Sequence, residues 1–225
     1  MIANNLHGIH DRIANACKAA ARPPESVSLL AVSKTFGASA VEQAFATGQT
    51  AFGENYIQEA VEKITGLAHL PLQWHCIGPI QSNKTRLVAE HFQWVHTVDR
   101  LKIAQRLSEQ RPAHLAPLQV CIQVNVDGGP TKSGVATAEA LELVQAVAAL
   151  PRLRLRGLMC IPEPAPDFIA ACAVFARART LFDQLNLAGM VLDTLSMGMS
   201  ADLEAAIASG STMVRVGSAI FGDRG

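Results

Sequence analysis

The chain has 225 residues, a length that suits one barrel or two smaller domains. Hydrophobic residues make up 49% of the chain and charged residues 17%, which excludes a disordered protein and favours many buried elements. Basic and acidic residues number 19 each, so no overall positive field favours nucleic acid or an anionic membrane surface, and we expect neither as a partner.

The chain begins with a predicted helix over residues 2–21, whose apolar spacing places Leu6, Ile9 and Ile13 on one stripe. Beyond it, short apolar runs alternate with longer segments of helical spacing, a pattern typical of βα units around a parallel sheet. Eight strands are expected, at residues 27–33, 51–53, 72–77, 94–98, 118–126, 153–161, 192–196 and 213–216. Seven helices are expected between them, at about residues 38–47, 55–66, 80–91, 100–111, 137–149, 167–186 and 201–209.

Eight parallel strands with covering helices predict a (β/α)8 TIM barrel that occupies residues 1–225 as one domain. Little chain follows the last strand, so the last helix is expected to be short or missing, with helix 2–21 covering part of its wall. An open doubly wound sheet would place a glycine-rich loop after the first strand. The segment there reads Ser33-Lys34-Thr35-Phe36-Gly37, without GxGxxG, which disfavours that fold and dinucleotide binding.

The cysteines and the N-terminal segment indicate a cytoplasmic protein. The five cysteines are odd in number and have no CxxC spacing, and Cys76, Cys121 and Cys160 lie within apolar runs, as buried thiols do in a reducing compartment. The first 21 residues carry charges among their apolar positions, so they lack the core of a secretion signal. No run of about 18 uncharged apolar residues predicts a membrane helix.

A lysine stands where the active site of such a barrel is built, at the carboxyl end of a strand. The first strand runs through Leu29-Leu30-Ala31-Val32-Ser33 directly into Lys34, whereas Lys18, Lys63, Lys84 and Lys102 fall in helix-like or polar surroundings. A lysine that loses solvation has a lowered pKa, and its neutral amine can condense with a carbonyl group. From this feature alone, Schiff-base chemistry and a lysine with its head in solvent stay equally open.

The last two strands are followed by loops of small residues. These loops read Ser196-Met197-Gly198-Met199-Ser200 and Arg215-Val216-Gly217-Ser218. Phosphate sites of these barrels are commonly built there, because glycines let backbone amides approach the phosphate oxygens. Each loop alone also fits an ordinary turn, with Ser200 capping the next helix. Both loops together with a lysine at a strand end point to a phosphorylated carbonyl compound, which describes pyridoxal 5′-phosphate (PLP).

Seven sequence runs carry a family resemblance that extends over nearly the whole chain. They are LLAVSKT (29–35), FGENYIQE (52–59), WHCIGPIQSNK (74–84), HTVDR (96–100), LRLRGLMCIP (153–162), LSMGMSADLEAAI (195–207) and GSTMVRVGSAIFG (210–222). In this order they closely resemble the pyridoxal phosphate homeostasis proteins, which are single-domain barrels related to the N-terminal domain of bacterial alanine racemase. The resemblance implies a PLP-binding barrel that takes part in intracellular PLP homeostasis, as a carrier or buffer that delivers cofactor to apoenzymes.

The resemblance also implies roles for individual residues. Lys34 is the Schiff-base lysine, Arg215 faces the pyridine nitrogen, and Asn55 lines the pocket of the ring. The chain departs from many relatives at Phe36-Gly37, where a proline often follows the lysine, and at Cys76, where an aromatic residue is common; both bear on the pocket wall. The phosphate is held by Ser200, Gly217 and Ser218.

Two enzymatic alternatives remain open. An arginine that faces the pyridine nitrogen leaves it unprotonated, because a guanidinium only donates, and this disfavours a transaminase. An amino-acid racemase of the alanine racemase fold type would need a second acid/base group opposite Lys34. In the racemases this group is a tyrosine of a second domain, whereas Tyr56 is the sole tyrosine here and suits packing or ring support better. A Schiff-base aldolase acting on a sugar phosphate is the second enzymatic alternative.

Loss of the domain that builds racemase dimers favours a monomer.

Other polar residues are given lesser roles. Lys132 follows the fifth strand and opens on the site face, either as a second amine or phosphate contact or in a solvated loop. His75 and His96 lack metal-ligand spacing and are expected to be core or pocket-lining rings, so no metal is predicted. Arg152, Arg154 and Arg156 enter the sixth strand from its N-terminal side and are expected to be structural.

Overall fold

A computed structural model of the chain describes residues 1–129 and 133–222. Its centre is a ring of parallel strands in the order β4-β3-β2-β1-β9-β8-β7-β5, which the pairing of β4 with β5 closes. The predicted (β/α)8 barrel is therefore confirmed. The ring consists of β1 (Ser28–Val32), β2 (Ala51–Glu54), β3 (Gln73–Cys76), β4 (Trp94–Val98), β5 (Leu118–Asn125), β7 (Leu153–Met159), β8 (Thr194–Ser196) and β9 (Met213–Val216).

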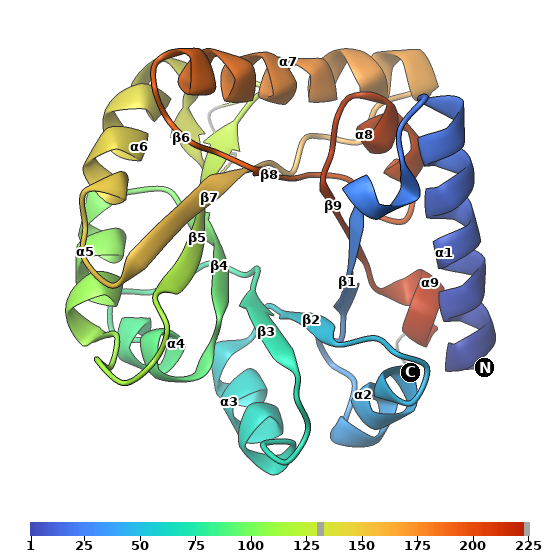
Figure 1. Cartoon of the computed structure of the whole chain (residues 1–225), viewed down its shortest axis with the longest axis horizontal. Coiled ribbons are helices and arrows are strands. Elements are labelled where there is room, and N and C mark those ends of the chain that lie inside the picture. Colours follow the sequence, from blue (N-terminus) through green and yellow to red (C-terminus); the bar gives the residue numbers. More distant parts are fainter. Residues whose placement is uncertain (130–132, 223–225) are drawn as a thin grey trace.

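Helices surround this ring, as Figure 1 shows. They follow the expected alternation, and Asp167 caps α7 by accepting a hydrogen bond of 2.8 Å from the backbone N–H of Ala170. Short 3-10 turns precede β1 at Pro24–Ser26 and α6 at Thr137–Glu139. The helices are α1 (Ile2–Ala19), α2 (Ala38–Phe45), α3 (Ile57–Gly66), α4 (Thr85–His91), α5 (Leu101–Gln110), α6 (Ala140–Ala148), α7 (Phe168–Leu187), α8 (Leu203–Ala208) and α9 (Ser218–Phe221).

The first helix covers the wall beside the short last helix, as predicted. Leu6, Ile9 and Ile13 are buried, and α1 packs against α8 and α9. The Asn5 side-chain amide donates to the backbone carbonyl of Ile220 at 2.8 Å. The N-terminal helix thus completes the side of the barrel that the four residues of α9 leave open.

Three expectations differ from the structure. The helix expected at residues 80–91 begins only at Thr85. A further strand, β6 (Val135–Ala136), pairs with the end of β5 outside the ring; its two residues are too few to show a period in the sequence. The helix expected from residue 201 begins at Leu203, with Asp202 rather than Ser200 at its N-cap position. The Asp202 carboxylate instead accepts from the backbone N–H of Met199 at 2.6 Å, which fixes the turn that contains Ser200.

The two faces of the strands differ in polarity. Outward side chains such as Phe52, Val95 and Ile122 pack beneath the helices in the main apolar core. The inside of the ring instead holds buried polar groups, among them His96 and Arg215. In the part of the chain that the structure describes, no helix is long and apolar enough to cross a membrane.

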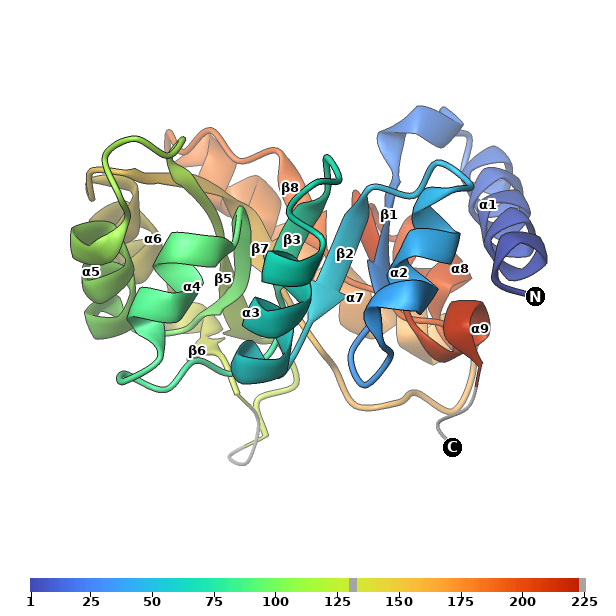
Figure 2. The ribbon, with the colours of Figure 1, turned by 90° about the horizontal axis from the view of Figure 1, so that it is seen from below.

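The carboxyl ends of the strands lie at one end of the barrel. Figure 2 shows β6, α9 and the long connection from β7 to α7 at this end, which is the lower side of that view. The loops that follow β1, β2, β8 and β9 therefore meet there, and the candidate site is built from them.

Candidate functional site

A cavity of about 760 Å³ opens at the carboxyl end of the barrel. The structure brings every predicted site residue to this one cavity, although they come from opposite ends of the sequence. Phe36, Ile77, Ile161 and Met199 supply apolar wall. The predicted residues in the lining are Lys34, Asn55, Ser200, Arg215, Gly217 and Ser218.

Lys34 lies two residues beyond the end of β1 and is half-buried. The preceding residue, Ser33, is fully buried, and its hydroxyl donates to Glu54 Oε1 at 2.6 Å. On the other side, the backbone N–H of Thr35 donates to Glu59 Oε1 at 2.9 Å. Thr35 adopts a left-handed backbone with φ of 69°, a conformation that such contacts must hold in a residue with a Cβ.

A buried ion pair joins these contacts. Lys63 Nζ donates to the backbone carbonyl of Ser33 at 3.0 Å and to Glu54 Oε1 at 2.6 Å, and it lies 3.3 Å from Glu59 Oε1. Burial raises the pKa of Glu54, while the charge and donated bond of Lys63 and the Ser33 hydroxyl act in the opposite direction. We call Glu54, Glu59 and Lys63 the lysine brace, because together they hold the residues on both sides of Lys34.

The sequence analysis missed the brace. It grouped Lys63 with lysines in helix-like or polar surroundings, whereas Lys63 is only 7% exposed in α3. The available signal was the four-residue spacing of Glu59 and Lys63 on the predicted helix, directly after Glu54 at the end of a strand.

The loops after β8 and β9 place small residues on the other side of the cavity. Gly217 is the N-cap of α9, and a Cβ there would lie 3.2 Å from the backbone oxygen of Val32, so glycine lets this turn lie close to β1. Ser218 is the first residue of α9, so backbone N–H groups of the first helical turn lie beside the cavity. Gly198 has a φ of 100°, which favours glycine in the turn before Ser200.

Arg215 lies inside the barrel and reaches the cavity from β9. Its guanidinium donates to Ser196 Oγ at 2.7 Å and to the backbone carbonyl of Cys160 at 3.0 Å. Burial lowers the pKa of Arg215, but from a starting value so high that the side chain stays cationic. Among the described residues it makes no ion pair with a carboxylate, so its charge is left for a ligand in the cavity.

Asn55 follows β2 and has a polar atom that lacks a partner. Its Oδ1 is buried and accepts no hydrogen bond from the described part of the chain. A buried polar atom without a partner is costly, so a hydrogen-bond donor on a molecule bound in the cavity would stabilise this position. The close approach of the next loop requires glycine, since a Cβ at Gly78 would lie 2.2 Å from the backbone oxygen of Asn55.

The two departures and the sole tyrosine lie in different places. Phe36 lines the cavity, so a pocket wall altered at this position fits the structure. Cys76 does not line it: the side chain packs in the core outside the ring, because successive residues of a strand face opposite sides. Tyr56 is 53% exposed and is not part of the cavity lining.

His75 and His96 are not part of the lining of this cavity. Lys132 falls outside the described residues. His75 and His96 are fully buried inside the barrel. No group of three or more His, Cys, Asp or Glu side chains within residues 1–129 and 133–222 is arranged to hold a metal ion.

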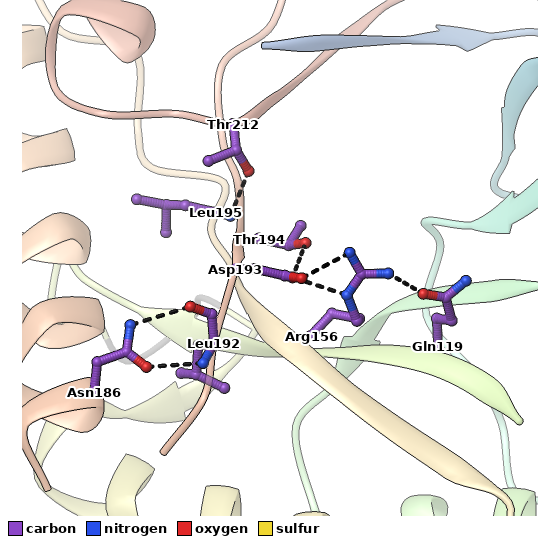
Figure 3. Close-up of polar contacts among 8 residues, drawn as sticks. All are labelled: Gln119, Arg156, Asn186, Leu192, Asp193, Thr194, Leu195 and Thr212. Atoms are coloured by element: carbon purple, nitrogen blue, oxygen red, sulfur yellow. Dashed lines mark hydrogen bonds and ion pairs between the residues drawn. The ribbon is translucent and has the colours of Figure 1, made fainter. Parts of the chain in front are cut away.

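Arg156 of β7 makes polar contacts with the neighbouring segments, which Figure 3 shows. Its guanidinium pairs with both carboxylate oxygens of Asp193, at 2.8 and 2.9 Å, and donates to the Gln119 side chain. The guanidinium carbon also lies 4.7 Å from the ring centroid of Trp94. Arg156 thus has its contacts within the fold, away from the candidate site.

Comparisons with known proteins agree with this fold. The family model described as the N-terminal domain of alanine racemase matches residues 5–225. A "Pyridoxal phosphate homeostasis protein" of Pseudomonas aeruginosa is 62% identical over 223 residues, which cover 99% of this chain and 96% of that protein. One of Escherichia coli with the same name is 54% identical over 226 residues, with coverage of 99% and 97%.

A solved structure is similar over the full length. PipY of Synechococcus elongatus, determined with PLP bound, superposes with a TM-score of 0.86 at 38% identity and covers 99% of this chain and 100% of its own. The chain therefore belongs to the pyridoxal phosphate homeostasis proteins, within the family of the alanine racemase N-terminal domain.

Proposed function

We propose that this chain binds PLP in the cavity at the carboxyl end of the barrel, with Lys34 as the Schiff-base lysine. It acts in intracellular PLP homeostasis as a carrier or buffer that delivers the cofactor to apoenzymes. One observation carries the proposal: a single cavity unites Lys34, the buried guanidinium of Arg215 and the small-residue turns at Ser200 and Gly217. PLP-bound PipY and the names of the close relatives support it.

The residues present fit the parts of PLP. When bound, PLP supplies an aldehyde that condenses with an amine and a ring that withdraws electrons. Lys34 would hold the aldehyde carbon, while Ser200, Gly217 and Ser218 would hold the phosphate through hydroxyl and backbone donors. Asn55, whose buried oxygen has no partner within the described chain, would meet the ring's polar edge.

Arg215 determines how much chemistry such a site performs. A guanidinium only donates hydrogen bonds and keeps its protons, so a pyridine nitrogen that faces Arg215 would accept a hydrogen bond and stay unprotonated. This weakens electron withdrawal by the ring and disfavours a transaminase, which leaves a carrier or a racemase. For racemase activity, Tyr56 offers no support, because it is half-exposed and outside the cavity lining.

The test is reduction of the PLP-loaded protein with borohydride, followed by peptide mapping. We expect a pyridoxyl adduct on Lys34. K34A and K34R should both lose the adduct and the absorbance of the bound cofactor, since arginine keeps the charge but not the reactive amine. K102A, which alters a lysine of α5, is the matched control and should label like the wild type. An adduct on Lys132 alone would overturn the proposed site.

A second experiment separates the carrier from a racemase. The loaded protein is incubated in D₂O with alanine or serine, and the α-deuterium content is followed by mass spectrometry. A carrier should give negligible exchange, whereas fast exchange would contradict it. Delivery is tested by adding the loaded protein to a PLP-dependent apoenzyme: recovery of activity should match an equal amount of free PLP, and no recovery would refute transfer.

We also propose that the protein is a monomer in the cytoplasm. Each of its five cysteines is free, which suits a reducing compartment. Size-exclusion chromatography with light scattering should give a mass near 23.9 kDa. A mass of twice this value would contradict the monomer.

A further inference from the structure

A file of hydrogen-bonded side chains runs inside the barrel and ends on Arg215. Gln73 Oε1 lies 3.1 Å from His75 Nε2, and His75 Nδ1 lies 2.9 Å from His96 Nε2. His96 Nδ1 lies 2.9 Å from Ser196 Oγ, which accepts from Arg215 at 2.7 Å. We call these five residues the internal file. They come from β3, β4, β8 and β9.

The internal file is shielded from solvent except at its far end. His75, His96 and Ser196 are 0% exposed, whereas Gln73 is exposed at the first residue of β3. The His75 ring stacks on Trp94, with centroids 5.1 Å apart and planes 7° from parallel. The file therefore runs from the exposed start of β3 to the cavity that Arg215 lines, and packing holds its rings in place.

Hydrogen-bond chemistry gives the internal file a single direction. Gln73 Oε1 can only accept, so His75 carries its proton on Nε2 and its Nδ1 accepts from His96 Nε2. His96 Nδ1 then has no proton and accepts from the Ser196 hydroxyl. The Arg215 end leads to the same result, because a guanidinium only donates and the Ser196 proton has no other acceptor in the described chain.

The internal file is also neutral up to Arg215. Burial lowers the pKa of His75 to about 3 and that of His96 well below its ordinary value, with His75 and then Arg215 adding to the effect on His96. Arg156, whose guanidinium carbon lies 4.7 Å from the Trp94 ring centroid, is paired with Asp193. No carboxylate belongs to the file, so it offers Arg215 an oriented acceptor without any negative charge.

We propose that Gln73, His75, His96 and Ser196 are positioning residues that aim Arg215 at the ring of the bound cofactor. A carboxylate in place of Ser196 would fix the guanidinium equally well but would neutralise it. A file of neutral acceptors fixes its direction and leaves its charge directed at the cavity. The part that concerns the cofactor ring rests on the proposed function, whereas the proton positions belong to the protein alone.

The first test uses the cofactor-free protein and is therefore independent of PLP binding. Long-range ¹H–¹⁵N NMR of the histidine rings reports which nitrogen carries the proton. We expect His75 and His96 to be neutral with the proton on Nε2 throughout pH 5–9, and S196A to shift the His96 Nδ1 resonance. A proton on Nδ1 of either ring, or protonation within this range, would overturn the inference.

The second test reads the cofactor. S196A removes one of the two acceptors of Arg215, leaving the Cys160 carbonyl, and is expected to weaken PLP binding roughly tenfold and to move the absorbance maximum of the bound cofactor. H96Q keeps a side-chain acceptor for Ser196 and should retain the wild-type spectrum, whereas H96L should shift it as S196A does. T194V deletes another buried hydroxyl of β8, which donates to Asp193 instead, and should leave the spectrum unchanged.

The outcomes separate the two proposals. If S196A and H96L bind PLP with the wild-type affinity and spectrum, the positioning role is wrong. If T194V changes the spectrum as much as S196A, the effect belongs to packing and the role is again wrong. If the wild type shows the expected proton positions but forms no adduct on Lys34, the proposed function fails while the internal file stands.

Discussion

Lys63 Nζ lies 2.6 Å from Glu54 Oε1, and the exposed fractions of the two side chains are only 5% and 0%. Both members of this pair bond to Ser33, the residue before Lys34, so they fix the backbone that carries the Lys34 side chain. A buried pair is costly to form, and removing one member leaves an uncompensated charge in the interior.

The first prediction follows from this pair. E54Q leaves the Lys63 ammonium without its buried carboxylate and should lower the free energy of unfolding by about 3 kcal/mol. Urea denaturation of the cofactor-free protein, followed by circular dichroism, measures the change. R86A removes the exposed pair with Glu90 and is the control, with an expected loss below about 1 kcal/mol. Equal losses for the two variants would show that the buried pair contributes no more to the free energy of unfolding than the exposed pair.

Acid should destabilise the protein through its buried histidines. Both rings have a pKa below the ordinary value of 6.5, that of His75 being about 3, so the unfolded chain binds protons that the folded chain does not. Stability is then fully present above pH 6.5 and is lost as the pH falls towards about 3, with a limiting slope of about 1.4 kcal/mol per pH unit for each ring. Urea denaturation at several pH values between 7 and 5 measures this slope, because this pH range lies above the ordinary pKa of carboxyl groups.

Two variants test whether the loss of stability in acid comes from the buried histidines. H75Q removes one buried ring and should reduce the slope by about half, whereas H7Q alters an exposed histidine of α1 and should leave it unchanged. A wild-type slope near zero between pH 6 and 5 would mean that these rings titrate normally in the folded protein.

Gly78 offers a steric test of the loop beside Asn55. In G78A the new Cβ would lie 2.2 Å from the backbone oxygen of Asn55, so the backbone must move and Asn55 with it. We expect weaker PLP binding and a melting temperature several degrees lower, for a loss of about 1–3 kcal/mol. G66A, at the end of α3 where nothing lies within 4 Å, is the control and should be neutral or slightly stabilising. Unchanged PLP binding in G78A would show that the position of this loop does not affect the binding site.

The thiols should differ in reactivity. Burial raises the pKa of Cys76, Cys121 and Cys160 to about 12, so almost no thiolate forms near neutral pH. Cys172 is partly exposed and should react first with iodoacetamide, as mass spectrometry of the native protein can show. All five should react in guanidinium chloride, and rapid native labelling of Cys121 would contradict the buried barrel interior.

The sequence predicted the ring and the residues that meet at the cavity because both depend on local signals. Apolar runs mark strands, and Lys34 and Gly217 follow the ends of such runs, where the barrel fold gathers its loops. Their roles in binding remain a proposal. Lys63 was missed because its burial depends on how α3 packs against the ring, which helical spacing alone does not show.

The internal file could not be predicted for a similar reason. His75 and His96 are 21 residues apart, and His96 and Ser196 are 100 residues apart. Which of them meet depends on the register of the strands and on the closure of the ring, because these set the height of each inward side chain. The sequence correctly predicted that the rings of His75 and His96 lie in the interior. It did not indicate that they bond to each other and to Ser196.

The closure of the ring also affects when the site can exist during synthesis. β1 pairs with β9, with Leu30 opposite Arg215, so the lysine side of the cavity is made early and the arginine side last. A nascent chain that has not yet emerged as far as residue 216 lacks the wall formed by β9. Cofactor capture is consequently a property of the finished polypeptide, and a ribosome-stalled fragment ending before Met213 should leave PLP in solution.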